Sequence, residues 1–253
     1  MKTFTKDALR VEIYDDRASM GAAAGSLAAQ RIREALAQKE EVNVIFAAAP
    51  SQNEMLATLV AARDLDWSRV NAFHMDEYIG LNREAPQCFG NFLKDHIFGK
   101  LPFKAVHYIN CEATDKEAEC ARYTALLRQF PVDIVLLGIG ENGHVAFNDP
   151  PVADFQDPAL VKIVELDPVC RQQQVNDGCF ARLDLVPKFA LTLTVPALMA
   201  ADHLVCTVPA ATKAWAVEQT VNSEVGEHCP ATAMRHHKSA VLFCDRDSGG
   251  GLL

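Results

Sequence analysis

Short apolar runs of strand length alternate with longer segments of helical composition along most of the chain. The runs typical of buried strands span residues 9–14, 42–48, 70–75, 132–137, 160–165, 189–194, 204–208 and 240–244. The segments that favour helix span residues 18–38, 54–63, 86–98, 114–130 and 212–221. Strands alternating with helices predict βαβ units. We therefore expect an α/β fold, a mostly parallel sheet with helices on both faces, as a single domain over residues 1–253.

Polar residues before several helical segments are typical N-caps. Asp15 or Asp16 is expected to cap the first helix. Thr114 with Glu117 three residues later has the spacing of a capping box before the helix at 114–130. Ser51 and Asn53 can cap the helix at 54–63.

Composition excludes several classes of protein. The net charge is −9, with no basic stripe, which argues against a nucleic-acid partner. No apolar span of membrane length is present, and the first residues lack the apolar core of a signal peptide. The eight cysteines form no Cys-x-x-Cys pair, so the sequence suggests no metal site and a reducing compartment. The expected location is the cytoplasm.

The glycine-rich segment 138–150 follows the apolar run 132–137 and carries the densest set of reactive side chains. Ligands bind beyond the carboxyl ends of strands in parallel sheets. Gly138, Gly140 and Gly143 would let the backbone turn sharply beside a ligand, with His144 in the same turn. A glycine-rich turn with a solvated histidine is the alternative reading of this segment alone.

A second cluster, Asp76 and Glu77, comes directly after the apolar run 70–75. One of these carboxylates could act as a base at the sheet edge that carries His144, since proton transfer needs acid and base groups in one pocket. In the alternative reading, Asp76 caps the next element and Glu77 is solvated.

Two further strand-to-helix junctions favour an anionic ligand. The segment Ser51, Gln52 and Asn53 opens a helix whose backbone N–H groups can bind an anion. Lys213 stands in the first turn of another helix, where the macrodipole disfavours a cation unless an anion binds there. Together the junctions predict a small, negatively charged ligand at one edge of the sheet.

The segments 73–81 and 138–150 resemble the two signature stretches of the glucosamine-6-phosphate deaminase (isomerase) family, and the similarity extends over about residues 9–245. The related 6-phosphogluconolactonases share the Gly-x-Gly and Gly-His core of the second stretch. The Asp-Glu-Tyr sequence at 76–78 and Ala-Phe-Asn at 146–148 are more similar to the deaminases.

This resemblance implies a Rossmann-like domain that opens the ring of a hexosamine 6-phosphate, isomerises aldose to ketose and releases ammonia without a cofactor. Asp76 would carry the proton from C2 to C1, His144 would assist ring opening, and Asp149 would help to set the charge of the histidine. Lys213 and the loop 51–53 would hold the phosphate. The full set of expected substrate-binding residues is Ser51, Gln52, Asn53, Glu77, Gly140, Gly143, Arg171 and Lys213.

The sequence also departs from the family pattern. Asn142 replaces an Asp beside the histidine, so we expect Asn142→Asp to raise turnover on the closed ring by up to ~10²–10⁴-fold. The usual Gly-rich phosphate loop is Ala-Pro-Ser-Gln at 49–52, and an Arg expected a little after Asn176 is absent, although Arg171 lies close in sequence. Residues of an allosteric phosphate site in some relatives are not matched at Val152, Ala153 and Pro158.

Three functions are compatible with these residues. The first is deamination and isomerisation of glucosamine 6-phosphate to fructose 6-phosphate. The second is lactone hydrolysis of a sugar phosphate with His144 as the base for water, which has no obvious need for Asp76. The third is a phosphosugar-binding sensor without catalysis. In each case the partner is a small sugar phosphate, and a homo-oligomer is possible.

Overall fold

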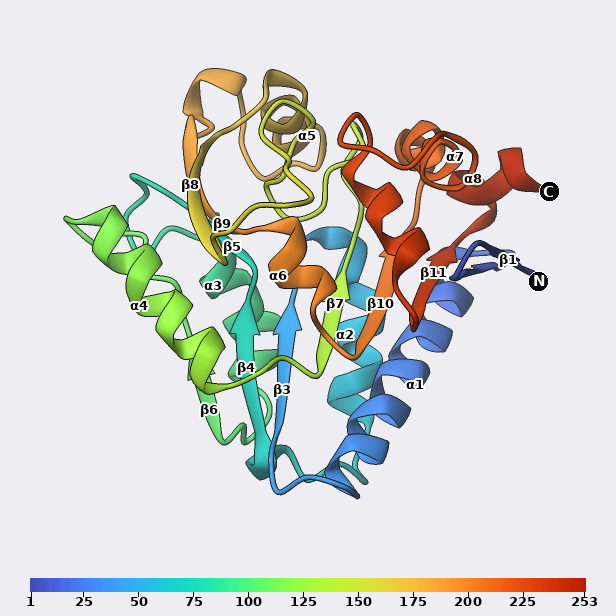
Figure 1. Ribbon diagram of the computed structural model, residues 1–253, viewed down its shortest axis with the longest axis horizontal. Helices are drawn as coiled ribbons and strands as arrows, with labels where there is room; N and C mark the ends of the chain where they lie inside the picture. Colours follow the sequence, from blue (N-terminus) through green and yellow to red (C-terminus); the bar gives the residue numbers. More distant parts are fainter.

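The computed structural model describes all 253 residues, and its centre is an eight-stranded sheet in the order β1-β2-β11-β10-β7-β3-β4-β6 (Figure 1). These strands are β1 (Lys2–Lys6), β2 (Leu9–Ile13), β3 (Val42–Phe46), β4 (Val70–His74), β6 (Ala105–His107), β7 (Ile134–Leu137), β10 (His203–Val208) and β11 (Ala240–Cys244). Every neighbouring pair is parallel except β1 and β2. The predicted mostly parallel α/β sheet is confirmed.

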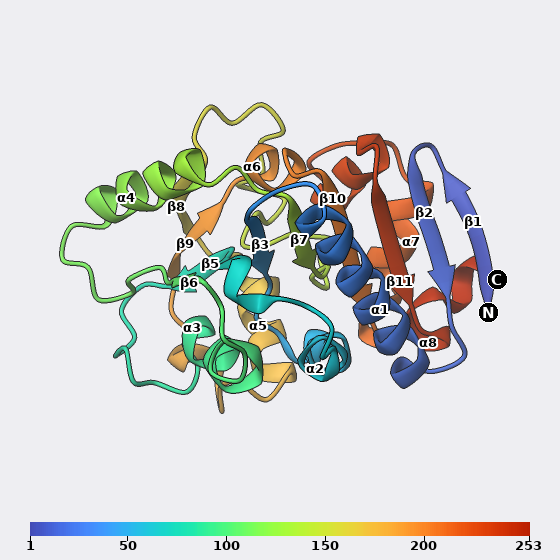
Figure 2. The same ribbon diagram turned by 90° about the horizontal axis from the view of Figure 1, so that it is seen from below.

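The inner strands are apolar on both faces because helices cover both faces. In β3, Val44 and Phe46 belong to one core and Ile45 to the other. The first core contains side chains of α1 (Arg17–Leu36), α2 (Asn53–Ala61) and α3 (Phe89–Leu93), and the second contains those of α4 (Lys116–Gln129), α6 (Val195–Met199) and α7 (Ala214–Asn222). Figure 2 shows α2 and α3 on one side of β3 and α4 and α6 on the other.

A separate three-stranded sheet holds β5 (Asp76–Tyr78), β9 (Phe189–Leu193) and β8 (Val161–Glu165), with antiparallel pairing throughout. The runs 160–165 and 189–194 are therefore strands, as predicted, but they lie outside the parallel sheet. The segment directly after 70–75 forms β5, in which Asp76 pairs with Thr192 of β9. The connection from β8 to β9 contains α5 (Pro168–Asn176), which the apolar pattern does not predict.

The helix starts confirm one expected cap and correct two others. The Asp16 side chain caps α1 by accepting from the Ser19 N–H, as predicted. Asp115, and not Thr114, caps α4, because its carboxylate accepts from the Ala118 N–H. No side chain caps α2, since a 3₁₀ turn at Pro50–Gln52 leads directly into it.

Two further helices begin later than expected, α3 at Phe89 and α7 at Ala214, the latter after a 3₁₀ turn at Ala211–Lys213. The last α-helix is α8 (Arg246–Gly249), and a 3₁₀ turn at Gly250–Leu252 follows it. None of the helices combines the length and the apolar character that crossing a membrane requires.

Candidate active site

A pocket of about 120 Å³ lies beyond the carboxyl ends of β3, β4, β7 and β10. Its walls come mainly from the loops that follow these strands and from α5 with its C-cap, and Arg17 of α1 and Phe89 of α3 also line it. The predicted site residues that line it are Ser51, Gln52, Asp76, Gly140, His144 and Lys213. The parallel sheet thus gathers residues from four distant segments at one edge, which is the arrangement that the junctions in the sequence predict.

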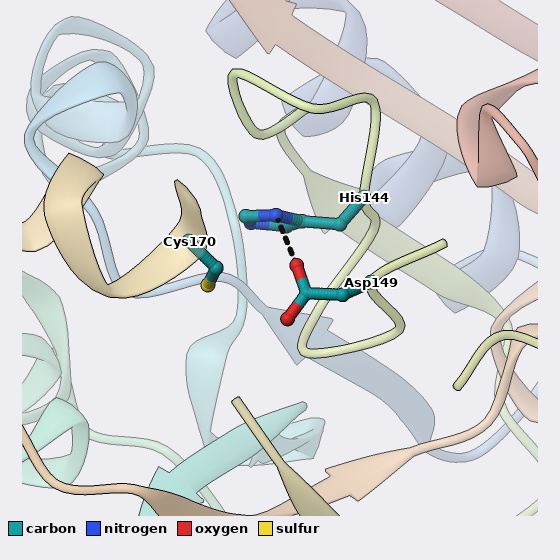
Figure 3. A group of neighbouring side chains, drawn as sticks. All are labelled: His144, Asp149 and Cys170. Atoms are coloured by element: carbon teal, nitrogen blue, oxygen red, sulfur yellow. Dashed lines mark ion pairs between the residues drawn. The ribbon is translucent and has the colours of Figure 1, made fainter. Parts of the chain in front are cut away.

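His144 faces the pocket with two oxygens behind it. Its Nδ1 lies 2.7 Å from Oδ1 of Asn142 and 2.9 Å from Oδ1 of Asp149. The ion pair with Asp149 is drawn in Figure 3. The Asn142 amide in turn donates from Nδ2 to Asp149 Oδ1 at 3.0 Å. Asn142 and Asp149 therefore lie close to His144, as expected, but behind it and outside the pocket wall.

This arrangement fixes the tautomer of the neutral imidazole. Both neighbours of Nδ1 are acceptors, so Nδ1 carries the hydrogen and Nε2 is the free acceptor. Burial by itself would raise the pKa of Asp149, but His144, the Asn142 amide and the Asp167 N–H at 3.1 Å hold it below the ordinary aspartate value. Asp149 therefore stays a carboxylate and can stabilise an imidazolium when His144 takes up a proton.

Asp76 is buried at the start of β5, and its side chain lines the same pocket. Burial raises the pKa of Asp76 well above the ordinary aspartate range, and the adjacent Glu77 carboxylate adds to the rise. A carboxylate with a raised pKa is a stronger base, which suits the removal of a proton from carbon.

Glu77 points away from Asp76, as alternation along a strand requires. Its carboxylate accepts from the backbone N–H groups of Tyr78, Phe89 and Gly90 at 2.9–3.1 Å. Burial raises the pKa of Glu77 to about 7, although these N–H groups favour its charged form. Glu77 is thus neither solvated nor in the pocket wall, and the expected substrate contact is not seen, because its side chain fixes the start of α3.

Two glycines of the turn 138–144 are required by close contacts. A Cβ on Gly140 would lie only 2.0–2.3 Å from the imidazole atoms of His144. Gly143 has a φ of +84°, and a Cβ there would lie 2.6 Å from the Sγ of Cys229. Gly140 therefore lets His144 pack flat on the backbone, whereas Gly143 shapes the turn and is not part of the pocket lining.

The loop between β3 and α2 presents a hydroxyl to the pocket. Gln52 is fully buried, and its Oε1 accepts from the Thr207 hydroxyl at 3.0 Å. Its Nε2 donates to Ser51 Oγ at 3.0 Å. Because Ser51 Oγ accepts this hydrogen bond, its own hydrogen remains available to a ligand. Asn53 is the first residue of α2 and does not line the pocket, contrary to expectation.

Lys213 is a buried cation without a carboxylate in ion-pair contact. Its side chain lines the pocket, and none of the ion pairs in the structure includes it. Burial lowers the pKa of Lys213, while the charges of Asp177 and Glu141 partly oppose this. A buried, unpaired ammonium is costly, and an anionic ligand would offset that cost.

Arg171 was expected near the substrate, but the structure places it elsewhere. Its Nη2 donates to the carbonyl oxygens of Leu183 and Val186 at 2.8 Å each. The side chain lines a neighbouring pocket on the far side of Asp149. Its position on α5 turns it away from the site, and sequence proximity alone could not show this.

Sequence reasoning missed five polar side chains that line the pocket: Arg17, Gln173, Gln174, Asp177 and Thr212. The last of these adjoins Lys213 and had been considered only as a helix start. Gln173, Gln174 and Asp177 come from α5 and its C-cap, and the apolar pattern does not reveal this helix. Arg17 belongs to α1, whose start packs against the start of α2, and no local signal in the sequence indicates this contact.

His144, Asp149 and Cys170 offer three possible metal-ligand atoms within 4.8 Å of one another (Figure 3). In the structure Nδ1 of His144 already faces Asn142 and Asp149. Burial also raises the pKa of the Cys170 thiol well above its ordinary value, so it is protonated at neutral pH. The contacts of this cluster are those of a hydrogen-bonded group around Asp149.

Known proteins resemble this chain over most of its length. The family model of glucosamine-6-phosphate isomerases/6-phosphogluconolactonase matches residues 15–243. A glucosamine-6-phosphate deaminase of Listeria innocua is 33% identical over 225 residues, which is 89% of this chain and 94% of that protein.

Two solved structures share the fold. A monomeric glucosamine-6-phosphate deaminase superposes with a TM-score of 0.87 at 26% identity, covering 95% of this chain and 98% of the other. The 6-phosphogluconolactonase of Thermotoga maritima has a TM-score of 0.75 at 19% identity, with 93% and 98% covered.

Proposed function

The chain belongs to the family of glucosamine-6-phosphate isomerases and 6-phosphogluconolactonases, and from this premise we propose that it is a glucosamine-6-phosphate deaminase. It converts glucosamine 6-phosphate and water to fructose 6-phosphate and ammonia. The observation that carries the proposal is the buried Asp76 in the same pocket as His144, whose Nε2 is a free acceptor. Isomerisation needs such a second base, whereas hydrolysis of a lactone needs only one for water.

Ring opening is assigned to His144. Its Nε2 accepts the proton of the C1 hydroxyl and delivers a proton to the ring oxygen as the C1–O5 bond breaks. The transient imidazolium is stabilised by Asp149, which lies 2.9 Å from Nδ1. The Asn142 amide orients the ring but adds no negative charge.

Asp76 is assigned the isomerisation. Its carboxylate takes the proton from C2 and returns it to C1, while one N–H proton of the amino group passes to O1. The C2–N bond thereby becomes an imine and C1 becomes a CH2OH group. Water then adds to C2 and ammonia leaves, which gives the ketose. Burial serves this step, because a desolvated carboxylate with a raised pKa is the stronger base.

Phosphate recognition is assigned to Lys213 and to the hydroxyl of Ser51, which Gln52 orients. We add no contact from Glu77 or Arg171. The cytoplasmic location, which eight free thiols favour, stays a prediction, as does the possible homo-oligomer.

The test is a comparison of substrates. Purified protein is incubated with glucosamine 6-phosphate, galactosamine 6-phosphate and 6-phosphogluconolactone, and ammonia, ketose and acid are measured separately. We expect equal amounts of ammonia and ketose from the glucosamine compound. Asp76→Asn should abolish both products and leave phosphosugar binding nearly intact, since the base acts on the transition state. Acid from the lactone, undiminished in Asp76→Asn, would instead establish the hydrolase.

A further inference from the structure

The pocket contains two Lys or Arg side chains, Lys213 and Arg17. Two acidic side chains, Asp76 and Asp177, also line it. The charge of Asp177, and not that of Asp76, acts on Lys213 and raises its pKa against the effect of burial. A phosphate monoester carries a charge of about −1.5 to −2 at neutral pH, so Lys213 beside Asp177 leaves part of that charge uncompensated.

No cation comes from the helix α5, although α5 forms one wall of the pocket. The residues that it and its C-cap supply are Gln173, Gln174 and Asp177. Arg171 of α5 lies outside this pocket and donates to two backbone carbonyl oxygens, those of Leu183 and Val186. The second positive charge must therefore come from a different element.

Arg17 is the first residue of α1 and lies over the loop that carries Ser51. Its Nε donates to Oε1 of Glu54 at 2.8 Å, and its Nη2 donates to the carbonyl oxygen of Pro50. These two contacts hold the guanidinium against the β3–α2 loop, while Nη1 makes no hydrogen bond within the protein. The side chain is 38% exposed, so it remains accessible to a ligand in the pocket.

Close packing of α1 on α2 makes the contact between Arg17 and the β3–α2 loop possible. A Cβ on Gly21, one turn after Arg17, would lie 2.2 Å from the Cβ of Glu54. The glycine therefore lets the two helix starts approach closely, and this brings Arg17 from a distant part of the sequence to the rim of the site.

We propose that Arg17 is a substrate-binding residue that grips the phosphate of the substrate together with Lys213 and Ser51. This rests on the proposed phosphosugar substrate and extends it, since neither the family resemblance nor the pocket loop assigns a role to α1. Glu54 and the Pro50 carbonyl position the guanidinium, and Nη1 supplies the charge-assisted hydrogen bond to the phosphate.

The alternative role for Arg17 is a structural ion pair with Glu54 across two helices. A part-exposed pair of this kind contributes little to folding, and removing either partner would remove the same contribution. The two roles thus differ in what happens when Glu54 loses its charge. Glu54→Gln leaves the guanidinium in place and removes a negative charge near the phosphate, so a binding role predicts unchanged or tighter anion binding.

The experiment measures equilibrium binding of inorganic phosphate by calorimetry, and separately the KM and kcat for glucosamine 6-phosphate. We expect Arg17→Gln to weaken phosphate binding and to raise KM by about tenfold, the effect of one charge-assisted hydrogen bond. Glu54→Gln should bind phosphate at least as well as the wild-type protein, and Arg17→Lys should recover part of the affinity. Arg33→Gln is the matched control, because Arg33 is on the same helix, pairs with Asp64 and does not line the pocket.

The outcomes separate this proposal from the proposed function. If Arg17→Gln binds phosphate like the wild-type protein, or if Glu54→Gln loses affinity as Arg17→Gln does, Arg17 has only a structural role. If the wild-type protein binds phosphate through Arg17 but releases no ammonia from the amino sugar, the assignment of Arg17 stands and that of the reaction falls. Thermal unfolding of each variant shows that the protein is folded, and Arg17→Lys answers the question should Arg17→Gln not fold.

Discussion

Replacing Asn142 by Asp is the sharpest test of how the groups behind His144 share their protons. In the structure Nδ2 of Asn142 donates to Asp149 Oδ1 at 3.0 Å, while Oδ1 of Asn142 faces the imidazole. In Asn142→Asp this donor becomes an oxygen, and two carboxylates stand where one carboxylate and one amide stood. The substitution therefore adds a negative charge and removes a hydrogen bond in a buried place.

The electrostatic cost of the added charge follows from the distance between the two carboxylates. Two unit charges about 3.0 Å apart repel by about 5 kcal/mol at an effective dielectric constant of ~20. That energy corresponds to roughly four pH units. The variant is expected to relieve it by binding one more proton near neutral pH, and the imidazole is the most basic of the three groups.

A histidine held as imidazolium cannot accept the proton of the C1 hydroxyl. We therefore expect turnover of the closed ring to fall at pH 7, by about tenfold or more, and to recover at alkaline pH. This is the opposite of the gain expected from the sequence alone, where the hydrogen bond from Asn142 to Asp149 is not visible. Open-chain substrate, which bypasses ring opening, should show a much smaller loss.

The assay is ammonia release from closed-ring substrate between pH 5 and pH 9.5, roughly the range in which imidazole titrates, with C2 deuterium exchange on open-chain substrate in parallel. Asn142→Ala is the control, since it removes the amide without adding charge and should lose activity with no alkaline shift. A pH profile of Asn142→Asp that overlays the wild-type profile, or a gain at pH 7, would refute the reasoning.

Three other predictions concern the same pocket. His144→Gln should lose closed-ring turnover but keep C2 exchange on open-chain substrate, a step assigned to Asp76; equal loss of both would remove this division of labour. Gly140→Ala should reduce closed-ring turnover by ~10²-fold or more with the chain still folded, because the new Cβ would displace the imidazole that it meets at 2.0–2.3 Å; unchanged kinetics would contradict the assigned position of His144. Activity requires ionised Asp76, and both burial and the Glu77 charge raise the pKa of Asp76. The acid limb of the kcat/KM profile should therefore lie well above pH 4, and Glu77→Gln should move it to lower pH. An acid limb that stays in place would show that the Glu77 charge does not act on Asp76.

The sheet edge could be predicted from the sequence because each junction there carries its own local signal. An apolar strand followed by a glycine-rich or acidic turn specifies a strand end, and parallel pairing brings such ends together without any further information. Asp76, His144 and Lys213 were found in this way. Their convergence follows from strand direction alone.

The remaining site residues depend on contacts that no local pattern encodes. Arg17 reaches the pocket only because α1 and α2 meet at their starts, and Glu77 leaves it because β5 pairs with β9. The predicted cap of α4 was wrong by one residue. Thr114 and Asp115 are both suitable N-caps, and the structure uses the carboxylate of Asp115. Such choices depend on tertiary packing, which outweighs local preference.

Asp149 has a second contact with a practical consequence. While one of its oxygens faces His144, the other accepts from the backbone N–H of Asp167, the residue that caps α5. The Asp149 carboxylate thus connects the histidine to the start of the helix that supplies one wall of the pocket. Anyone who redesigns this protein for another sugar by transplanting α5 will also change the catalytic group, unless the graft preserves that single backbone hydrogen bond.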